Sequence, residues 1–373
     1  MNLVFVSGTS WHTFKKNGFR TRQGALLNEF SHTPKFDRLV IVTETGFRGE
    51  ASYEEINAPG CVPITQVYIP GRLPESLTRP FGNMGFQSNY LLPSGNWLPK
   101  NNVMIWSYSA KLGLCLKHRA QSKFFYDVID YRPADLNLTF WNRYLWRLEL
   151  SLACRVADII VCNGETARQR LSPQAKNGCE LVRNGVDPNR FLYSRNNIAR
   201  HGAGFVGVIS RWIDFELLQN LLIALPEVDF IFFGVVHSNK ERIETLQRRK
   251  NFHWLGEIAP QDIPAFLAKC ALGILPYKNQ ITKISIGDSM KVFEYLAAGT
   301  PVVCTDFQDG LQEKFSGLIE ICEDADKFIS AVRSFANQQP NQDWQNRAWQ
   351  FVLENTWQKR VEKIISINDL LTS

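Results

Sequence analysis

A lysine and a glutamate three residues apart are the side chains of this 373-residue chain whose types and spacing most clearly suggest chemistry. Lys291 and Glu294 lie in a segment, residues 274–306, that reads as a strand, a loop, a short helix ended by Gly299 and Pro301, and another apolar strand. Lys291 falls in the first turn of the helix, where the helix dipole disfavours a cation. A bound anion would reverse that preference, because helix N-terminal N–H groups and a lysine together hold phosphate.

The same spacing also fits an ordinary amphipathic helix. Met290 and Phe293 would then belong to its buried face, and Asp288 or Ser289 would be its N-cap. The lysine and the glutamate would be solvated and only weakly paired. The helix by itself leaves both interpretations open.

The string from Lys291 to Val303 resembles the nucleotide-sugar signature of two-domain (GT-B) glycosyltransferases of the family 4 and family 1 type, K-x-x-E-x-L-A-x-G-x-P-V-V. The resemblance implies an α/β fold with two doubly wound, Rossmann-like domains that face each other across a cleft. It also implies that Lys291 neutralises the donor diphosphate and that Glu294 binds the ribose hydroxyls.

Length and composition fit two globular domains. The chain is too long for one ordinary core, and 45% hydrophobic with 21% charged residues is typical of globular proteins. No apolar run reaches the roughly 20 residues of a membrane span, and MNLVFVSGTSW reads as a strand and turn rather than a signal peptide. The eight cysteines form no CxxC pair, and Cys162 and Cys304 lie in apolar runs, which indicates buried thiols in a reducing cytoplasm.

Charge is divided unevenly along the chain. Residues 1–200 hold 25 Lys and Arg against 15 Asp and Glu, a net of +10, whereas residues 201–373 hold 17 against 21, a net of −4. A basic half favours an anionic partner such as lipid phosphate, a membrane surface or nucleic acid, although charge also drifts between domains without function. A nucleic-acid-binding protein would not explain the phosphate helix, so we expect no nucleic acid partner and a place in the cytoplasm or at the inner face of the cell membrane.

Strands and helices alternate in both halves, which predicts two parallel sheets. We expect an acceptor-binding domain over residues 1–197, a nucleotide-sugar-binding domain over 198–345, and a C-terminal helix over 346–373 that packs back towards the first domain. The predicted strands are 2–6, 39–43, 103–106, 123–128, 159–162 and 180–182, then 204–208, 229–233, 252–255, 272–276, 301–304 and 318–321.

Further segments resemble the family in the same order along the chain. GFVGVISRW resembles the first strand and loop of the donor domain, which implies that Arg211 meets phosphate at the strand's carboxyl end. FHWLGE and ILPYK resemble the segments that hold the base, which implies that Gly256, Glu257 and Tyr277 line the nucleobase pocket. NGVD, residues 184–187, reads as an architectural turn.

The subgroup resemblance is to teichuronic-acid and xanthan glucuronosyl-type transferases, through GTSW, GFRTRQGALLNEF and SMKVFEY. It implies that Ser289 and Met290 contact the diphosphate. Two places depart from the retaining pattern: Ile286 replaces an acid, and Asp214 and Glu216 stand near the place of a lysine. We therefore expect inversion at the anomeric carbon.

Inversion requires a general base that deprotonates the acceptor hydroxyl. YDVIDYR, residues 126–132, resembles the Y-x-V-x-D segment that carries the catalytic aspartate of the xanthan type, which implies Asp130 as the base and Asp127 as the second choice. Both could instead cap a turn. His12, expected in the loop after the first strand, is a third candidate, although a lone histidine in a turn is more often simply a polar residue at the surface.

No metal or other cofactor is expected. The only D-x-D string, Asp324 to Asp326, reads as a strand end and a helix start, where acids are simply stabilising. Lys291, Arg211 and the helix N-terminus would stabilise the departing nucleoside diphosphate without a metal.

The acceptor is less readable from the residues. In segment 70–99, aromatic residues such as Phe86 and Trp97 alternate with Arg72 and Arg79, which favours contact with a membrane or a lipid-linked acceptor. A mobile loop over a cleft or ordinary packing explains this segment equally well.

These observations predict a hexosyltransferase-type enzyme that uses a nucleotide sugar to build a polysaccharide or glycolipid. The expected donor is a UDP-sugar. A nucleotide-sugar epimerase of the same fold and a noncatalytic GT-B-fold binding protein remain alternatives. A NAD-dependent oxidoreductase is disfavoured, because neither first-strand turn carries GxGxxG.

Overall fold

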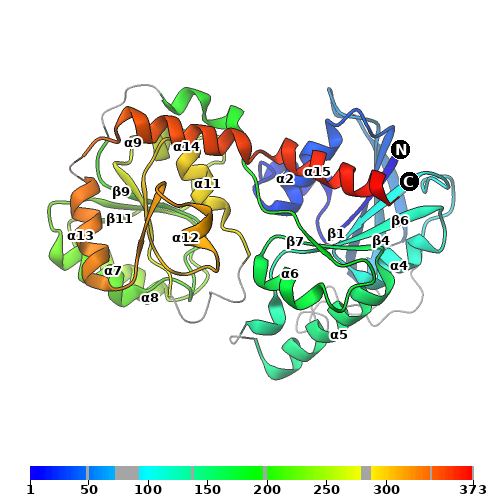
Figure 1. Cartoon of the computed structure of the whole chain (residues 1–373), viewed down its shortest axis with the longest axis horizontal. Coiled ribbons are helices and arrows are strands. Elements are labelled where there is room, and N and C mark those ends of the chain that lie inside the picture. Colours follow the sequence, from blue (N-terminus) through cyan, green and yellow to red (C-terminus); the bar gives the residue numbers. More distant parts are fainter. Residues whose placement is uncertain are drawn as a thin grey trace. The chain divides into compact units, whose positions relative to one another are not determined.

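The computed structural model describes residues 1–47, 50–71, 92–135, 138–195, 200–278, 287–336 and 338–371. The chain divides into two compact units: residues 1–183 with 357–373, and residues 184–356 (Figure 1). The second unit thus begins at residue 184, whereas the sequence placed the boundary at 198. Each unit is built on a mainly parallel sheet with helices beside it, which confirms the predicted α/β class.

The first unit contains an eight-stranded sheet of order β3-β4-β2-β1-β5-β6-β7-β8, parallel except for the antiparallel pair β3 and β4. Its strands are β1 (Asn2–Ser7), β2 (Arg38–Phe47), β3 (Ser52–Ile56), β4 (Ile64–Gly71), β5 (Val103–Ser107), β6 (Ser122–Val128), β7 (Ile159–Cys162) and β8 (Cys179–Leu181). Its helices are α1 (Trp11–Lys16), α2 (Arg22–Ser31), α4 (Ala110–Lys117), η1 (Arg132–Ala134), α5 (Phe140–Val156), α6 (Glu165–Leu171) and α15 (Trp357–Leu370).

Side-chain alternation gives this sheet two buried faces. In β1, Val4 and Val6 join the core that Leu112 of α4 and Leu150 of α5 also enter. Phe5 points to the other face, where its ring lies 6.3 Å from that of Phe30 in α2. Helix α15 packs against α2, so the C-terminal segment belongs to the first unit.

The second unit contains a six-stranded, fully parallel sheet of order β11-β10-β9-β12-β13-β14. Figure 1 shows α9, α11 and α14 on one side of it and α7, α8 and α13 on the other. The strands are β9 (Ala203–Val206), β10 (Phe230–Phe233), β11 (Phe252–Trp254), β12 (Leu272–Leu275), β13 (Val302–Thr305) and β14 (Ile319–Cys322). The helices are η2 (Pro188–Arg195), α7 (Phe215–Ala224), α8 (Lys240–Leu246), α9 (Ile263–Lys269), α11 (Met290–Ala297), α12 (Leu311–Lys314), α13 (Ala325–Ala336) and α14 (Gln342–Glu354).

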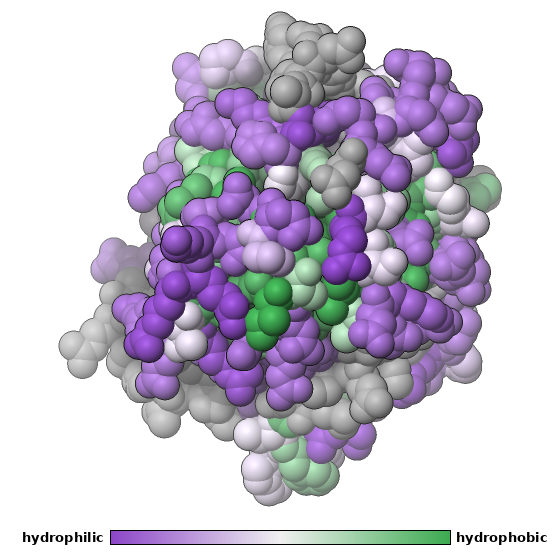
Figure 2. Space-filling model, turned by 90° about the vertical axis from the view of Figure 1, so that its left-hand side faces the viewer, coloured by the Kyte–Doolittle hydropathy of each residue, from purple (hydrophilic) through white to green (hydrophobic). Residues whose placement is uncertain are grey.

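Each of the twelve predicted strands is present, and β3 and β4 are additional. All eight cysteines are free and six of them are buried, including Cys162 and Cys304, which confirms the predicted buried thiols. Within the described ranges no helix has both the length and the apolar character that a bilayer crossing requires. The face drawn in Figure 2 is mainly hydrophilic, with hydrophobic residues gathered near its centre.

Candidate functional site

In the second sheet, the direction in which the chain adds successive strands reverses between β9 and β12. From β9 the chain continues to β10 and β11 on one side, whereas from β12 it continues to β13 and β14 on the other. The loops that leave the carboxyl ends of β9 and β12 therefore diverge, and in such sheets this is where ligands bind. The loop after β9 is residues 207–214; that after β12 begins at 276–278, and residues 279–286 lie outside the described part of the chain.

Helix α11 places Lys291 at this point. Gly207 directly follows β9 with a φ of 151°, and a Cβ there would lie 2.2 Å from Cε and 3.1 Å from Nζ of Lys291. The ammonium also lies 5.7 Å from the ring centroid of Tyr277, which follows β12. The Lys291 ammonium therefore lies at the carboxyl ends of β9 and β12, where the loops that follow these two strands diverge.

Tyr295 fixes helix α11 to the same two strands. Its hydroxyl accepts a hydrogen bond of 2.9 Å from the N–H of Val206 in β9. Its ring covers Gly273 of β12, where a Cβ would lie 2.2 Å from Cδ2. Burial raises the pKa of Tyr295 well above its usual value, so the phenol stays neutral. Sequence reasoning missed Tyr295, although a glycine inside a buried strand signals close packing.

A polar cluster holds the N-terminus of α11. The buried Asp288 carboxylate accepts hydrogen bonds from the Asn184 N–H at 3.2 Å and from Gln308 Nε2 at 3.2 Å, and pairs with Lys314. Ser289 is the N-cap residue, and its N–H donates to Gln308 Oε1 at 2.8 Å. The start of the helix is thus fixed by neighbouring side chains, and Asp288 serves as an anchor rather than as the cap.

The two other charged candidates are Glu294, which lies on the same helix as Lys291, and Arg211, which follows β9. Glu294 is partly buried, and its Oε1 lies 3.9 Å from Nη1 of Arg190 in η2, whose Nη2 donates to the Pro260 carbonyl at 3.1 Å. Arg211 follows β9 and is exposed, and its guanidinium lies 5.0 Å from the ring centroid of Trp212. Their roles towards ribose and phosphate stay predictions.

The predicted base-binding residues divide into two kinds. Gly256 and Glu257 follow β11; at Gly256, with a φ of 74°, a Cβ would meet nothing within 4 Å, and Glu257 is exposed. Tyr277 is buried instead, with ring centroids 6.2 Å from Phe205 and 4.9 Å from Phe307. Gly256 and Glu257 therefore border open space, whereas Tyr277 supports Lys291 from the core.

Residues that depart from the retaining pattern have a local explanation where the structure describes them. Asp214 is the N-cap of α7 and accepts from the N–H groups of Glu216 at 3.1 Å and Leu217 at 3.0 Å. An acid at this position stabilises the first turn of that helix. Ile286 lies outside the described residues.

In the first unit, Asp127 is enclosed by partners. It is the last residue but one of β6, and its two oxygens accept from Nε and Nη2 of Arg22, each at 3.0 Å. Both side chains are buried. The Tyr108 hydroxyl is hydrogen-bonded to Asp127, and desolvation followed by the Asp127 charge raises the pKa of Tyr108 well above its usual value. This arrangement favours a structural role for Asp127.

Asp130 and His12 are accessible by comparison. The Asp130 side chain is 25% exposed and pairs with Arg132 at 3.0 Å. His12 lies in the first turn of helix α1, so its expected place in a loop was wrong; Ser10 caps this helix by accepting from the Thr13 N–H. The imidazole is exposed and its Nε2 lies 3.6 Å from Oε1 of Glu54.

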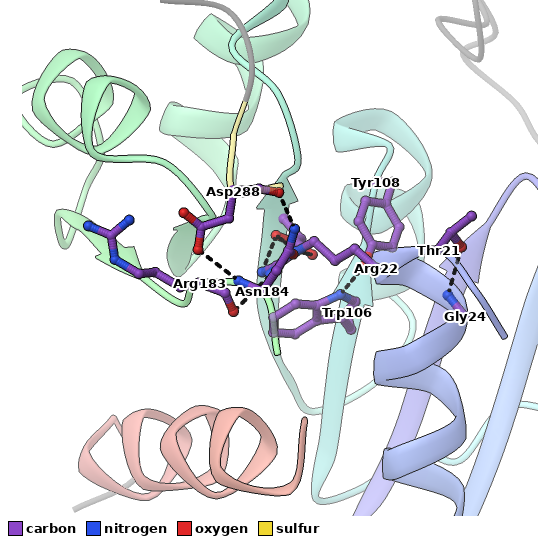
Figure 3. Close-up of polar contacts among 9 residues, drawn as sticks. Thr21, Arg22, Gly24, Trp106, Tyr108, Arg183, Asn184 and Asp288 are labelled. Atoms are coloured by element: carbon purple, nitrogen blue, oxygen red, sulfur yellow. Dashed lines mark hydrogen bonds and ion pairs between the residues drawn. The ribbon is translucent and has the colours of Figure 1, made fainter. Parts of the chain in front are cut away.

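The chain passes from the first unit to the second between Arg183 and Asn184, and each side of this junction is held within its own unit. Arg22 donates through Nη1 to the Arg183 carbonyl at 3.3 Å, and Nδ2 of Asn184 donates to the Asp288 carbonyl at 2.6 Å (Figure 3). The turn at 184–187 therefore has contacts that its sequence did not reveal.

Among the described residues, no group of three or more His, Cys, Asp or Glu side chains is placed to hold a metal ion. Asp324 accepts from the Lys327 N–H at 2.8 Å at the start of α13, as expected for a helix-capping acid. Trp97 is buried and donates to the Pro93 carbonyl at 2.9 Å, so it is a core residue rather than part of a surface. Residues 72–91 of the predicted acceptor segment, including Arg72, Arg79 and Phe86, lie outside the described residues.

Comparison with known proteins finds a family similarity within the second unit. Residues 201–338 match the profile described as Glycosyl transferases group 1. A curated protein similar to this chain is TuaH of Bacillus subtilis (strain 168), provisionally named a teichuronic acid biosynthesis glycosyltransferase; identity is 30% over 181 residues, which is 45% of this chain and 45% of TuaH. The chain thus spans about half the length of that relative.

Solved structures match this chain over 98–100% of its length. Sucrose-phosphate synthase from Thermosynechococcus elongatus has a TM-score of 0.68 at 13% identity, and the match covers 100% of this chain and 99% of the synthase chain. The UDP-forming trehalose-phosphate synthase of Burkholderia xenovorans has a TM-score of 0.69 at 12% identity, and the match covers 98% of this chain and 99% of the synthase chain. Anabaena HepE in complex with UDP-glucose has a TM-score of 0.60 at 15% identity, and the match covers 98% of this chain and 99% of the HepE chain. These likenesses establish the fold, two Rossmann-like units of the GT-B type.

Proposed function

We propose that this protein is a glycosyltransferase that moves a sugar from a nucleotide sugar, a UDP-sugar by preference, to a carbohydrate or lipid-linked acceptor. The observation that carries the proposal is the Lys291 ammonium, which lies over Gly207 and Tyr277 at the switch point of a group 1 domain. A cation fixed there fits the diphosphate of a nucleotide sugar. The TuaH match supports a polysaccharide product.

On the donor side, the proposed roles follow the positions of the side chains. Lys291, the Ser289 hydroxyl and the Met290 N–H at the start of α11, and Arg211 compensate the negative charge that grows on the diphosphate as it leaves. Glu294 accepts hydrogen bonds from the ribose hydroxyls. Gly256 and Glu257 border the base, and Tyr277 acts through Lys291.

On the acceptor side, an acceptor hydroxyl attacks the anomeric carbon, the new glycosidic C–O bond forms, and the bond to the diphosphate oxygen breaks. Inversion in this single displacement requires one base to take the hydroxyl proton. Asp130 is the proposed base because its carboxylate is accessible, whereas Asp127 is enclosed by Arg22. His12, exposed on α1, is the remaining candidate.

The first test is calorimetric titration of the full chain with UDP, GDP and NAD, each in EDTA and then in magnesium. Lys291→Ala should weaken UDP binding by roughly 1.5–3 kcal/mol, or about 10- to 150-fold in Kd, the range of charge-assisted hydrogen bonds. Lys240→Ala is the matched control, because Lys240 is an exposed lysine on α8 of the same unit. No nucleotide binding by the wild-type chain would refute the proposal.

The second test separates transfer from the two alternatives. With a UDP-sugar and an acceptor, a transferase releases UDP, an epimerase releases an isomeric UDP-sugar, and a binding protein releases neither. Asp130→Asn should lower turnover by about 10²- to 10⁴-fold while UDP affinity stays unchanged. Asp37→Asn, at a more exposed carboxylate of the first unit, should behave as wild type. Normal turnover in Asp130→Asn would remove this residue as the base.

A further inference from the structure

Helix α5 exposes a row of large apolar side chains, Phe140, Trp141, Tyr144 and Leu148. Phe140 and Trp141 are 63% and 68% exposed, and these four residues make up a third of the twelve exposed large hydrophobic residues in the described part of the chain. Isolated exposed apolar residues are normal, but a row on one helix marks an interaction surface. We call these four residues the aromatic stripe.

The stripe is fixed in place by the rest of its helix. Phe140, Tyr144 and Leu148 recur every four residues and so follow one face. The ring centroids of Phe140 and Trp141 are 5.7 Å apart, and those of Trp141 and Tyr144 are 6.3 Å apart, both in edge-on contact. On the opposite face, Leu150 and its neighbours are buried in the core of the first unit. The helix therefore cannot turn the stripe inward.

The charges around the stripe are of one sign. Helix α5 carries Arg143, Arg147 and Arg155 and a single acid, Glu149. Arg147 and Arg155 are exposed, whereas Glu149 is buried and accepts the Ala110 N–H at 2.7 Å. All exposed charge on the helix is thus positive, in a half of the chain whose net charge is +10. Such a surface complements an anionic one.

We propose that the aromatic stripe docks the first unit onto an anionic lipid bilayer. Trp and Tyr rings favour the boundary between headgroups and acyl chains, and a helix with an aromatic face and arginines beside it lies in that boundary. Arg147 and Arg155 pair with lipid phosphates from the flanks of the stripe. A second copy of the chain fits less well, because a symmetric pairing would bring the same arginines together. This inference goes beyond the proposed function and needs no donor to be tested.

The test is flotation of the full chain with vesicles of phosphatidylcholine alone and of phosphatidylcholine mixed with phosphatidylglycerol. The wild-type chain should float with the anionic vesicles, and added salt should release it. The variant Phe140→Ser with Trp141→Ser should lose at least about tenfold in binding. The control variant, Ile223→Ser with Leu255→Ser, removes apolar residues of similar exposure from the second unit and should float as wild type.

The arginines have a separate readout. The variant Arg147→Gln with Arg155→Gln should lose the preference for anionic vesicles while the aromatic stripe is intact. Circular dichroism and UDP titration confirm that each variant is folded. Failure of the wild-type chain to float, or equal flotation of the aromatic variant, would overturn the inference. So would a dimer in sedimentation velocity that this variant abolishes without any vesicle binding, since the stripe would then cover a second copy. UDP binding without flotation leaves the proposed function standing.

Discussion

Replacing Gly207 by alanine tests where the Lys291 ammonium lies. The new Cβ would stand 2.2 Å from Cε, and 3.4 Å is the lower end of ordinary contact, so Cε must move by 3.4 − 2.2 = 1.2 Å. The lysine side chain is flexible and its partner is an added methyl group, so the fold should survive. The φ of 151° is a region that L-residues avoid, which should lower the free energy of unfolding by about 1–3 kcal/mol.

The same displacement should act on the donor. A movement of 1.2 Å stretches a charge-assisted hydrogen bond from about 2.8 Å to near 4 Å, where it is lost. We therefore expect Gly207→Ala to raise the Kd for UDP by about 10- to 150-fold, as Lys291→Ala should. If the ammonium does not contact the diphosphate, the affinity should not change.

Calorimetry of a double-mutant cycle separates this effect from a general loss of structure. In the Lys291→Ala background, Gly207→Ala should change UDP affinity by less than about twofold, because the displaced group is already gone. Gly310→Ala is the matched control: its φ is 73°, and the nearest heavy atom to the new Cβ is 4.0 Å away. A folded Gly207→Ala with wild-type affinity, or effects that add in the double variant, would refute the reasoning.

Two further predictions concern buried polar groups. Tyr295→Phe removes the acceptor of the buried Val206 N–H and should lower the free energy of unfolding in urea by about 1–3 kcal/mol; an unchanged value would mean that water replaces the hydroxyl. Burial raises the pKa of Glu149 above 4.5, so the folded chain binds this proton more tightly and loses stability as pH rises through the folded-state pKa. Glu149→Gln still accepts the Ala110 N–H, so its stability relative to wild type should increase from about pH 4 to about pH 7, and parallel curves would contradict this.

Local signals explain what the sequence predicted well. Most of the twelve expected strands are short apolar runs that are largely buried between helix layers, so hydrophobicity marks them, whereas the edge strands β8, β11 and β14 are only partly buried. Helix α11 is bounded by local residues, a serine N-cap and Gly299, whose φ is 69°. Because Lys291 and Glu294 lie on this one helix, their common placement needed no long-range information.

Strands β3 and β4 lacked such a signal. The side chains of β3 are exposed apart from Ile56, and it is an antiparallel strand at the edge of its sheet. Its residues Ser52–Ile56 therefore show no buried face to recognise. In β4 the apolar pattern is interrupted by Gln66, which is buried because it accepts the Trp11 N–H and donates to Thr43.

The choice between two aspartates also depended on distant residues. Asp127 and Asp130 both follow from one segment, and nothing in that segment says which is accessible. The difference comes from Arg22, 105 residues away, which donates to Asp127 through two nitrogens. A long-range pair of this kind has no signature in a single sequence.

Three glycines of the second unit connect these observations to the chemistry. A Cβ at Gly273 would meet Tyr295, one at Gly207 would meet Lys291, and one at Gly234 would lie 1.8 Å from the Gly207 carbonyl oxygen. Helix α11 and the strand ends are thus in contact where no side chain separates them. The backbone of the sheet therefore sets how closely α11 approaches the strand ends. The helix in turn sets the position of the Lys291 ammonium in the absence of a donor. In the proposed function, such a site would need little reorganisation when the donor binds, which is the condition for strong electrostatic stabilisation of a leaving diphosphate.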